Sequence, residues 1–85
     1  MVTLAKSYIR NSNYDSVNDI LYVHFANDRG MSYASDSPAG FEIMRDLDTN
    51  EMTGFMVYCA RSKESERQAQ LHSLGYELDY NAMLR

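Results

Sequence analysis

The fold is decided by the stretch Tyr14-Asp15-Ser16-Val17-Asn18-Asp19-Ile20-Leu21-Tyr22-Val23-His24-Phe25, in which an aspartate-rich turn runs directly into an alternating, aromatic-rich segment. Alternation with a period of two is typical of a sheet strand. Leu21, Val23 and Phe25 share one side of the strand and predict its core face, whereas Ile20, Tyr22 and His24 share the other side. The stretch therefore predicts where the sheet begins, but it places no reactive group.

Other segments extend this sheet. Ala5–Arg10 is expected to form a first short strand, which the polar cluster Asn11-Ser12-Asn13 then ends as a turn. A tight reversal with Gly30 at positive φ is expected next, so that Met31–Ser35 pairs back onto the strand at 20–25. Phe41–Arg45 and Gly54–Ala60 alternate again and predict a hairpin. In its second strand Phe55, Val57 and Cys59 are expected to face the core, with Met56, Tyr58 and Ala60 outward.

The segment from Ser62 to Leu74 predicts a helix, because it lacks β-branched residues and is rich in helix formers. Ser62 is the expected N-cap and Gly75 the glycine that ends the helix. Its apolar stripe is narrow and consists of Ala69, Leu71 and Leu74. Tyr76 to Tyr80 alternates as a last edge strand would, or forms a tail packed on a partner. The fold class is α+β: an antiparallel sheet of about four or five strands with one C-terminal helix.

Length, charge and cysteine content limit the class of protein. The 85 residues predict a single domain, 1–85, and a domain of this size buries only about 60–65% of its unfolded surface, which favours a homodimer. A net charge of −4 repels nucleic acid. The single cysteine, Cys59, fits a reducing compartment. With neither a signal peptide nor an apolar run long enough to span a bilayer, the sequence predicts a cytoplasmic protein without membrane contact.

Two acidic patterns contain the residue types of chemical sites. Asp46, Asp48 and Asn50 occupy alternate positions, like the first ligands of a calcium loop. Glu51 stands where that loop needs glycine and Val57 where it needs a bidentate glutamate, so a turn whose side chains bond their own backbone is expected in place of a metal site. Asp15 and Asp19 bracket the turn before the strand at 20–25. We expect them to cap that turn and to have no acid–base role.

Cys59, His24 and His72 supply the residue types of a thiol nucleophile and its base. Cys59 is expected on the core face, where an unpaired thiol behaves as a small hydrophobic residue. His24 is expected to be a half-exposed strand residue. The sequence therefore predicts no catalytic residue, no metal ligand and no cofactor.

The strongest compositional bias is seven tyrosines and six methionines without tryptophan. Tyr22, His24, Met56 and Tyr58 are expected to share the sheet face opposite the core. Tyrosine and methionine are favoured in protein contacts, so these four residues are the predicted protein interface. The alternative is that the C-terminal segment folds over this face and buries it within the chain.

Several short motifs resemble those of the small bacterial domain-of-unknown-function family numbered 2283. They are Tyr14-Asp15, Asp19, Leu21-Tyr22-Val23, Phe25, Gly40-Phe41-Glu42-Ile43, Asp46–Asp48 and Gly54-Phe55. The resemblance covers about Lys6 to Lys63. It implies a compact antiparallel sheet with little helix, a bacterial or phage-related setting and no established activity, and it suggests an antitoxin-type role beside a small toxin-like protein. Glu64–Arg85 and the longer connection at Thr49–Met52 depart from the family pattern.

The hypothesis that follows is a non-catalytic protein-binding module that self-associates or masks a small toxin-like partner. The first alternative is a phage or mobile-element inhibitor that uses its acidic surface against a nucleic-acid-binding enzyme, and strong salt sensitivity would mark such a complex. The second alternative, a metal-binding or thiol enzyme, fits the residue pattern least.

Overall fold

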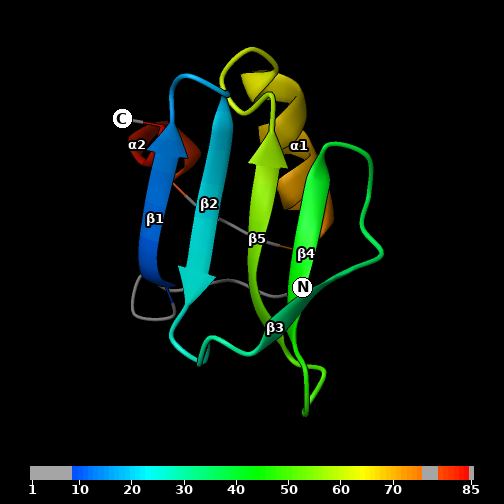
Figure 1. The fold of residues 1–85 in the computed structure, drawn as a ribbon. Coiled ribbons are helices and arrows are strands. Elements are labelled where there is room, and N and C mark those ends of the chain that lie inside the picture. Colours follow the sequence, from blue (N-terminus) through cyan, green and yellow to red (C-terminus); the bar gives the residue numbers. More distant parts are fainter. Residues whose placement is uncertain (1–8, 76–78, 85) are drawn as a thin grey trace.

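The computed structural model describes residues 9–75 and 79–84, and it contains an antiparallel sheet followed by two helices (Figure 1). The elements are β1 (Ile9–Asp15), β2 (Ile20–Phe25), β3 (Ser32–Ser35), β4 (Phe41–Asp46), β5 (Met52–Tyr58), α1 (Glu64–Ser73) and α2 (Tyr80–Met83). The five strands are ordered β1-β2-β5-β4-β3, and every neighbouring pair is antiparallel. The predicted α+β class, with an antiparallel sheet and a C-terminal helix, is confirmed.

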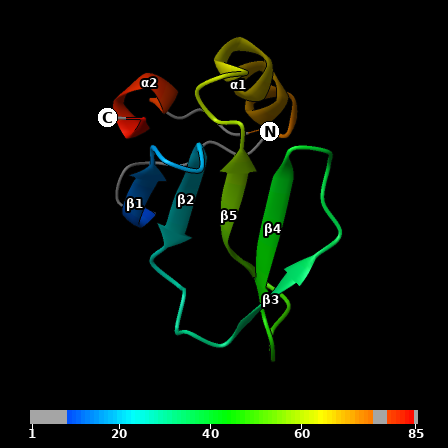
Figure 2. The ribbon, with the colours of Figure 1, turned by 45° about the horizontal axis from the view of Figure 1, so that its top comes forward.

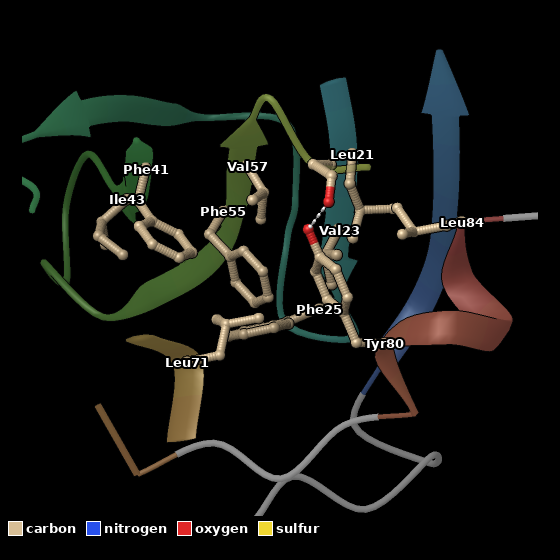
Figure 3. Close-up of a cluster of buried hydrophobic side chains, with 11 residues drawn as sticks. Leu21, Val23, Phe25, Phe41, Ile43, Phe55, Val57, Leu71, Tyr80 and Leu84 are labelled. Atoms are coloured by element: carbon tan, nitrogen blue, oxygen red, sulfur yellow. Dashed lines mark hydrogen bonds between the residues drawn. The ribbon is translucent and has the colours of Figure 1, made fainter. Parts of the chain in front are cut away.

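Both helices lie on the same side of the sheet, so the described part of the domain has two layers (Figure 2). The buried hydrophobic residues form one cluster between these layers. They are Leu21, Val23, Phe25, Phe41, Ile43, Phe55, Val57, Ala60, Leu71, Tyr80 and Leu84. Figure 3 shows Leu71 of α1 and Tyr80 of α2 pointing at the side chains of β2 and β5. The predicted core face of β2 is therefore confirmed.

Aspartates shape the turns of two hairpins, β1–β2 and β4–β5. Asp15 Oδ1 accepts hydrogen bonds from the N–H groups of Val17 and Asn18, at 3.0 and 3.2 Å. Asp46 Oδ1 accepts from the N–H groups of Asp48 and Thr49, at 2.9 and 3.0 Å, in the turn between β4 and β5. Short side chains that bond backbone groups two or three residues ahead are typical turn formers. These bonds fix both turns, and with them the register of both hairpins.

Two strand predictions are wrong. The Asn11-Ser12-Asn13 cluster, expected to be a turn, lies inside β1, which runs on to Asp15 beside β2. Ala5 to Tyr8 of the predicted first strand lie outside the described residues. β3 pairs with β4 and not with β2. The reversal at 27–30, with Gly30 at φ 81°, is present. The chain after it does not return along β2 but continues to the far edge of the sheet, beside β4 (Figure 1).

A polar contact directs this crossing. The Arg29 guanidinium bonds both carboxylate oxygens of Asp46, at 2.7 and 3.0 Å, and the Leu47 N–H donates to the Met31 carbonyl at 2.7 Å. A bidentate arginine–carboxylate pair fixes geometry as well as adding energy. It holds the loop after β2 at the far end of β4, where β3 then pairs.

The end of β5 differs from the expected alternation. β5 ends at Tyr58, and Cys59 takes a left-handed backbone conformation with φ 53°. Because of this turn, the inward and outward directions expected for residues 59 and 60 are exchanged: Cys59 is exposed, whereas Ala60 is fully buried. The prediction that Cys59 faces the core and Ala60 faces outward is therefore wrong.

The helix α1 begins two residues later than expected. Lys63 is its N-cap and makes no side-chain capping bond, because an ammonium group cannot accept one. The hydroxyl of Ser62, the expected cap, donates to Asp19 instead. Gly75, at φ 92°, ends the helix as predicted, with its N–H donating to the His72 carbonyl. Of the expected apolar stripe only Leu71 is buried, while Leu74 is 40% exposed and Ala69 is exposed.

Arg67 takes the place of the missing apolar contacts. It is 7% exposed, donates to the Tyr58 carbonyl at 2.8 Å and to Gln70 Oε1 at 2.9 Å, and lies over the ring of Phe41. In the C-terminal segment Tyr76–Leu78 lie outside the described residues. Asp79 caps α2 and Tyr80 begins it, so the expected edge strand is wrong at these two positions.

Gly54 allows β2 and β5 to lie close together. A Cβ atom at this position would overlap the backbone oxygen of Val23. We expect Gly54→Ala to lower the free energy of unfolding by about 1–3 kcal/mol, because a strand would have to shift. Urea unfolding followed by circular dichroism measures this. Gly30→Ala is the control: its Cβ meets nothing within 4 Å, and only backbone strain opposes it. Equal losses in both variants would contradict the close approach.

Candidate binding surface

The sheet face opposite the helices is the candidate functional site, and we call it the open face. Its central side chains come from alternate positions of β2, β5 and β4. They are Ile20, Tyr22, His24, Met56, Tyr58, Glu42 and Met44. The pairing register places Tyr22 opposite Met56, Met56 opposite Glu42, and Ile20 opposite Tyr58. The structure thus places Tyr22, His24, Met56 and Tyr58, the predicted interface residues, on one surface.

The open face combines partial burial with a mostly apolar character. Tyr22, Met56 and Tyr58 are half-buried, and His24 is exposed. Side chains facing one another on adjacent antiparallel strands lie about 4.5–5.5 Å apart at Cβ, so Tyr22 and Met56 form a continuous patch. This patch offers flat aromatic and thioether surface with hydroxyl groups beside it.

Two polar contacts lie within this surface. The Tyr58 hydroxyl donates to Glu42 Oε2 at 2.8 Å, and this bond to a carboxylate raises the pKa of the Tyr58 phenol above its ordinary value. His24 Nδ1 lies 3.1 Å from Asp28 Oδ2. The pKa of the Asp28 carboxyl is lowered, chiefly by the Gly30 N–H and further by His24. Each polar group thus has a defined partner at the margin of the patch.

The described helices do not cover the open face. Leu71 of α1 and Tyr80 and Leu84 at α2 all pack into the core cluster on the other side of the sheet. For residues 64–73 and 79–84, the alternative in which the C-terminal segment folds over the tyrosine face is therefore wrong. The reason is that the apolar side chains of both helices meet Val23, Phe25 and Phe55, whose alternation points them away from Tyr22.

Asp46, Asp48 and Asn50 form a turn, as expected. Arg29 donates to Asp46 and also to Asp48 Oδ2, at 2.6 Å, so the two carboxylates share one guanidinium. That contact, together with the N–H groups of Thr49 and Asp48, holds the pKa of the Asp46 carboxyl well below its usual range. Among residues 9–75 and 79–84 there is no group of three His, Cys, Asp or Glu side chains placed to hold a metal ion.

Asp15 and Asp19 have different structural roles. Asp15 caps its turn, as predicted, and its pKa is lowered chiefly by the Asn18 side chain. Asp19 links the turn to a distant segment. Its Oδ1 accepts from the Tyr14 hydroxyl and the Arg61 N–H, both at 2.7 Å. Its Oδ2 accepts from the N–H and the hydroxyl of Ser62, at 3.1 and 2.7 Å. Asp19 thereby fixes the start of α1 to the β1–β2 hairpin.

The three residues considered for thiol chemistry do not come together. His24 pairs with Gly54, whereas Cys59 lies beyond Tyr58 at the other end of the same ladder, roughly 16 Å away at 3.3 Å per residue. The Cys59 carbonyl accepts from Lys63 next to the first turn of α1, and His72 lies in the last turn, roughly 12 Å further along the helix. Neither histidine is within proton-transfer reach of the thiol.

Three residues with important contacts were missed by sequence reasoning. Arg67 is buried beneath Gly40, Tyr80 is buried with its hydroxyl donating to the Ala60 carbonyl at 2.6 Å, and Arg61 lies over the Tyr14 ring at 4.7 Å. The sequence does contain one signal for Arg67. Arg67 and Leu71 are four residues apart, which places them on the same helix face.

No helix in the described ranges combines the length and the apolar character that crossing a membrane requires. Comparisons with protein family models, with curated proteins and with solved structures find no match to this chain. The resemblance to the family numbered 2283 therefore stays a prediction from the quoted motifs.

Proposed function

We propose that this chain is a non-catalytic, homodimeric protein-binding module whose open face docks onto a small partner protein. The observation that supports the proposal is that the two faces of the sheet differ: one is covered by the described helices and the other is not. Both described helices pack on the core face, and the opposite face presents Tyr22, Met56 and Tyr58 in directly adjacent positions. Tyrosine and methionine supply contact area that adapts to a partner, and both are enriched at protein interfaces.

The class of partner is proposed from the motif resemblance and from the composition. The resemblance to the family numbered 2283 favours a bacterial setting and a toxin-like partner whose active surface the open face would cover. The acidic balance of the chain, −4, disfavours nucleic acid as the partner. The single cysteine supports a reducing compartment such as the cytoplasm.

Replacing Tyr22 and Tyr58 together by serine tests the docking surface. We expect tagged wild-type protein to retain a specific small protein from native cells and the Y22S/Y58S variant to lose it, because two aromatic contacts are removed from the centre of the surface. Mass spectrometry of the retained proteins is the measurement. Circular dichroism should show the same fold, since neither side chain belongs to the core.

Tyr33→Ser is the matched control. Tyr33 also has a half-exposed ring, but it lies next to Ala34, which pairs with Met44, and strand alternation places it on the opposite side of the sheet. The control should retain the same protein as the wild type. If all three proteins retain the same set, the open face is not the docking surface. A complex that dissociates steeply with added salt would favour the acidic-surface inhibitor instead.

A further inference from the structure

The strand β1 forms one edge of the sheet, and one side of its backbone has no strand partner among the described residues (Figure 1). It is seven residues long, contains neither lysine nor proline, and exposes the side chains of residues 10–13. Lysine, proline, β-bulges and short length are the usual devices that keep an edge from pairing with another chain. The one bulge of β1 lies between Ile9 and Asn11, so the strand is regular from Asn11 to Asp15. The other edge, β3, has only four residues, and Ser35 and Ser37 close its end with side-chain bonds.

We propose that β1 pairs antiparallel with β1 of a second copy of this chain, so that two five-stranded sheets continue as one. The inference rests on the homodimer named above and locates its interface at a sheet edge, separate from the open face. The proposed contact is made by backbone hydrogen bonds between the two edge strands, with side chains of each copy on both sides of the new ladder.

Symmetry restricts the register of this pairing. A twofold axis that joins two antiparallel edges runs normal to the sheet, so both copies keep their helices on the same side and opposed residues point to the same face. Because the bulge between Ile9 and Asn11 interrupts the regular backbone at one end of β1, we place the axis at Ser12, the middle residue of the Asn11–Asn13 segment. Ser12 then faces the partner's Ser12, and Asn11 faces the partner's Asn13. The sequence Asn-Ser-Asn reads the same in both directions, as a self-complementary contact requires.

The charges of β1 agree with this arrangement. Its only charged side chains are Arg10 and Asp15, near opposite ends of the strand. Antiparallel alignment about Ser12 sets the Arg10 end of one strand beside the end that carries the partner's Asp15, and it brings no like charges together. Opposite charges and paired polar side chains across strands are stabilising, whereas like charges directly opposite are destabilising. A second copy is therefore the occupant that this edge fits.

The pairing would also extend the open face. Asn11 pairs with His24 and Asn13 with Tyr22 in the β1–β2 ladder, so both asparagines lie on the open-face side. Joining two copies through β1 would make the two open faces one surface that spans the dimer. A partner would then meet two symmetry-related sets of tyrosine and methionine side chains.

A charge-swap pair of variants tests the edge and its register. Sedimentation of the wild type over a range of concentrations should give about twice the monomer mass of 9.8 kDa. N11K/N13K places lysines opposite one another twice across the axis and should raise the dimer Kd about tenfold or more. N11K/N13D places a lysine opposite an aspartate twice and should keep or strengthen the dimer. Thermal melts of both variants verify that the fold is retained.

The outcomes separate this inference from the proposed function. A wild type that stays at 9.8 kDa overturns the homodimer itself. A wild-type dimer that responds equally to N11K/N13K and N11K/N13D overturns the β1 interface and leaves the homodimer standing. Y22S/Y58S should sediment as a dimer, because its substitutions lie on β2 and β5 and leave the backbone of the edge strand unchanged. If this variant becomes a monomer, the copies meet through the open face and the edge pairing is wrong.

Discussion

Replacing Tyr80 by alanine is expected to lower the free energy of unfolding by about 3–5 kcal/mol, as removal of a large buried aromatic side chain does. Tyr80 is 1% exposed and belongs to the core cluster between α2 and the sheet. Its hydroxyl is held by the Ala60 carbonyl at 2.6 Å, and burial raises the pKa of the phenol far above its ordinary value. The side chain therefore fills the core and also fixes the turn that follows β5.

Urea unfolding monitored by circular dichroism measures this loss, and Tyr80→Phe separates its two parts. The phenylalanine variant keeps the ring but leaves the Ala60 carbonyl without its donor, so we expect a loss of about 1–3 kcal/mol. A Tyr80→Ala loss below about 1 kcal/mol would mean that α2 does not contribute to the core. A Tyr80→Phe loss equal to that of the alanine variant would assign the whole effect to the hydrogen bond.

Replacing Asp19 by alanine should cost roughly 2–4 kcal/mol, because one carboxylate accepts four hydrogen bonds from Tyr14, Arg61 and Ser62. Asp19 also has φ 57°, a conformation that asparagine tolerates better than alanine does. Asp19→Asn is therefore the control that keeps the backbone preference and the size while removing the charge. The Asp19→Asn variant should lose less unfolding free energy than the alanine variant, since its amide oxygen still accepts the hydrogen bond from Tyr14.

The Asp19 effect should depend on pH with a defined sign. Desolvation alone would raise the pKa of this carboxyl, but the hydrogen bonds from Tyr14, Arg61 and Ser62 together hold it well below its usual range. A carboxyl with a lowered folded-state pKa stabilises the protein above the unfolded-state value of about 3.9 and loses this contribution as the pH falls below it. The stability gap between wild type and Asp19→Asn should therefore be full at pH 7 and shrink below about pH 4.

Urea unfolding of both proteins at several pH values between about 7 and 2.5 gives this gap directly. Asp46 and Asp15 also have lowered pKa values, so both proteins should become less stable in acid. Subtracting the stability of Asp19→Asn from that of the wild type at each pH isolates the contribution of the Asp19 charge. A gap that stays constant down to the lowest pH would contradict a charge-dependent role for this carboxylate.

Local patterns were enough to predict the central elements of the fold. The alternation from Ile20 to Phe25 specifies a strand and its buried side, because a period of two leaves no other way to separate Leu21 and Val23 from Tyr22. The β4–β5 hairpin and the glycine that ends α1 follow from equally local rules. For the same reason the residues of the open face were placed together correctly from alternation alone.

Contacts between distant residues account for what could not be predicted. The position of β3 depends on Arg29 meeting Asp46, and the role of Asp19 depends on Arg61, 42 residues away. From the sequence alone, Arg67 is expected to be a solvent-exposed charge. In the structure it is buried and donates hydrogen bonds to the Tyr58 carbonyl and to Gln70. Cys59 adopts a positive φ, a conformation that is uncommon for residues other than glycine, so the sequence around Cys59 does not predict it. Each of these depends on tertiary structure that a sequence window does not contain.

The alternation of β2 and β5 has a consequence for protein engineering. Within these two strands, alternate side chains pack in the hydrophobic core, and the side chains between them lie on the open face. This surface can therefore be changed without changing the core. Tyr22, Met56 and Ile20 can therefore be randomised in combination while Val23, Phe55 and their neighbours preserve the architecture. The domain is thus a scaffold on which new binding specificities can be selected, with Gly54 held constant because a Cβ atom there would overlap the Val23 carbonyl oxygen.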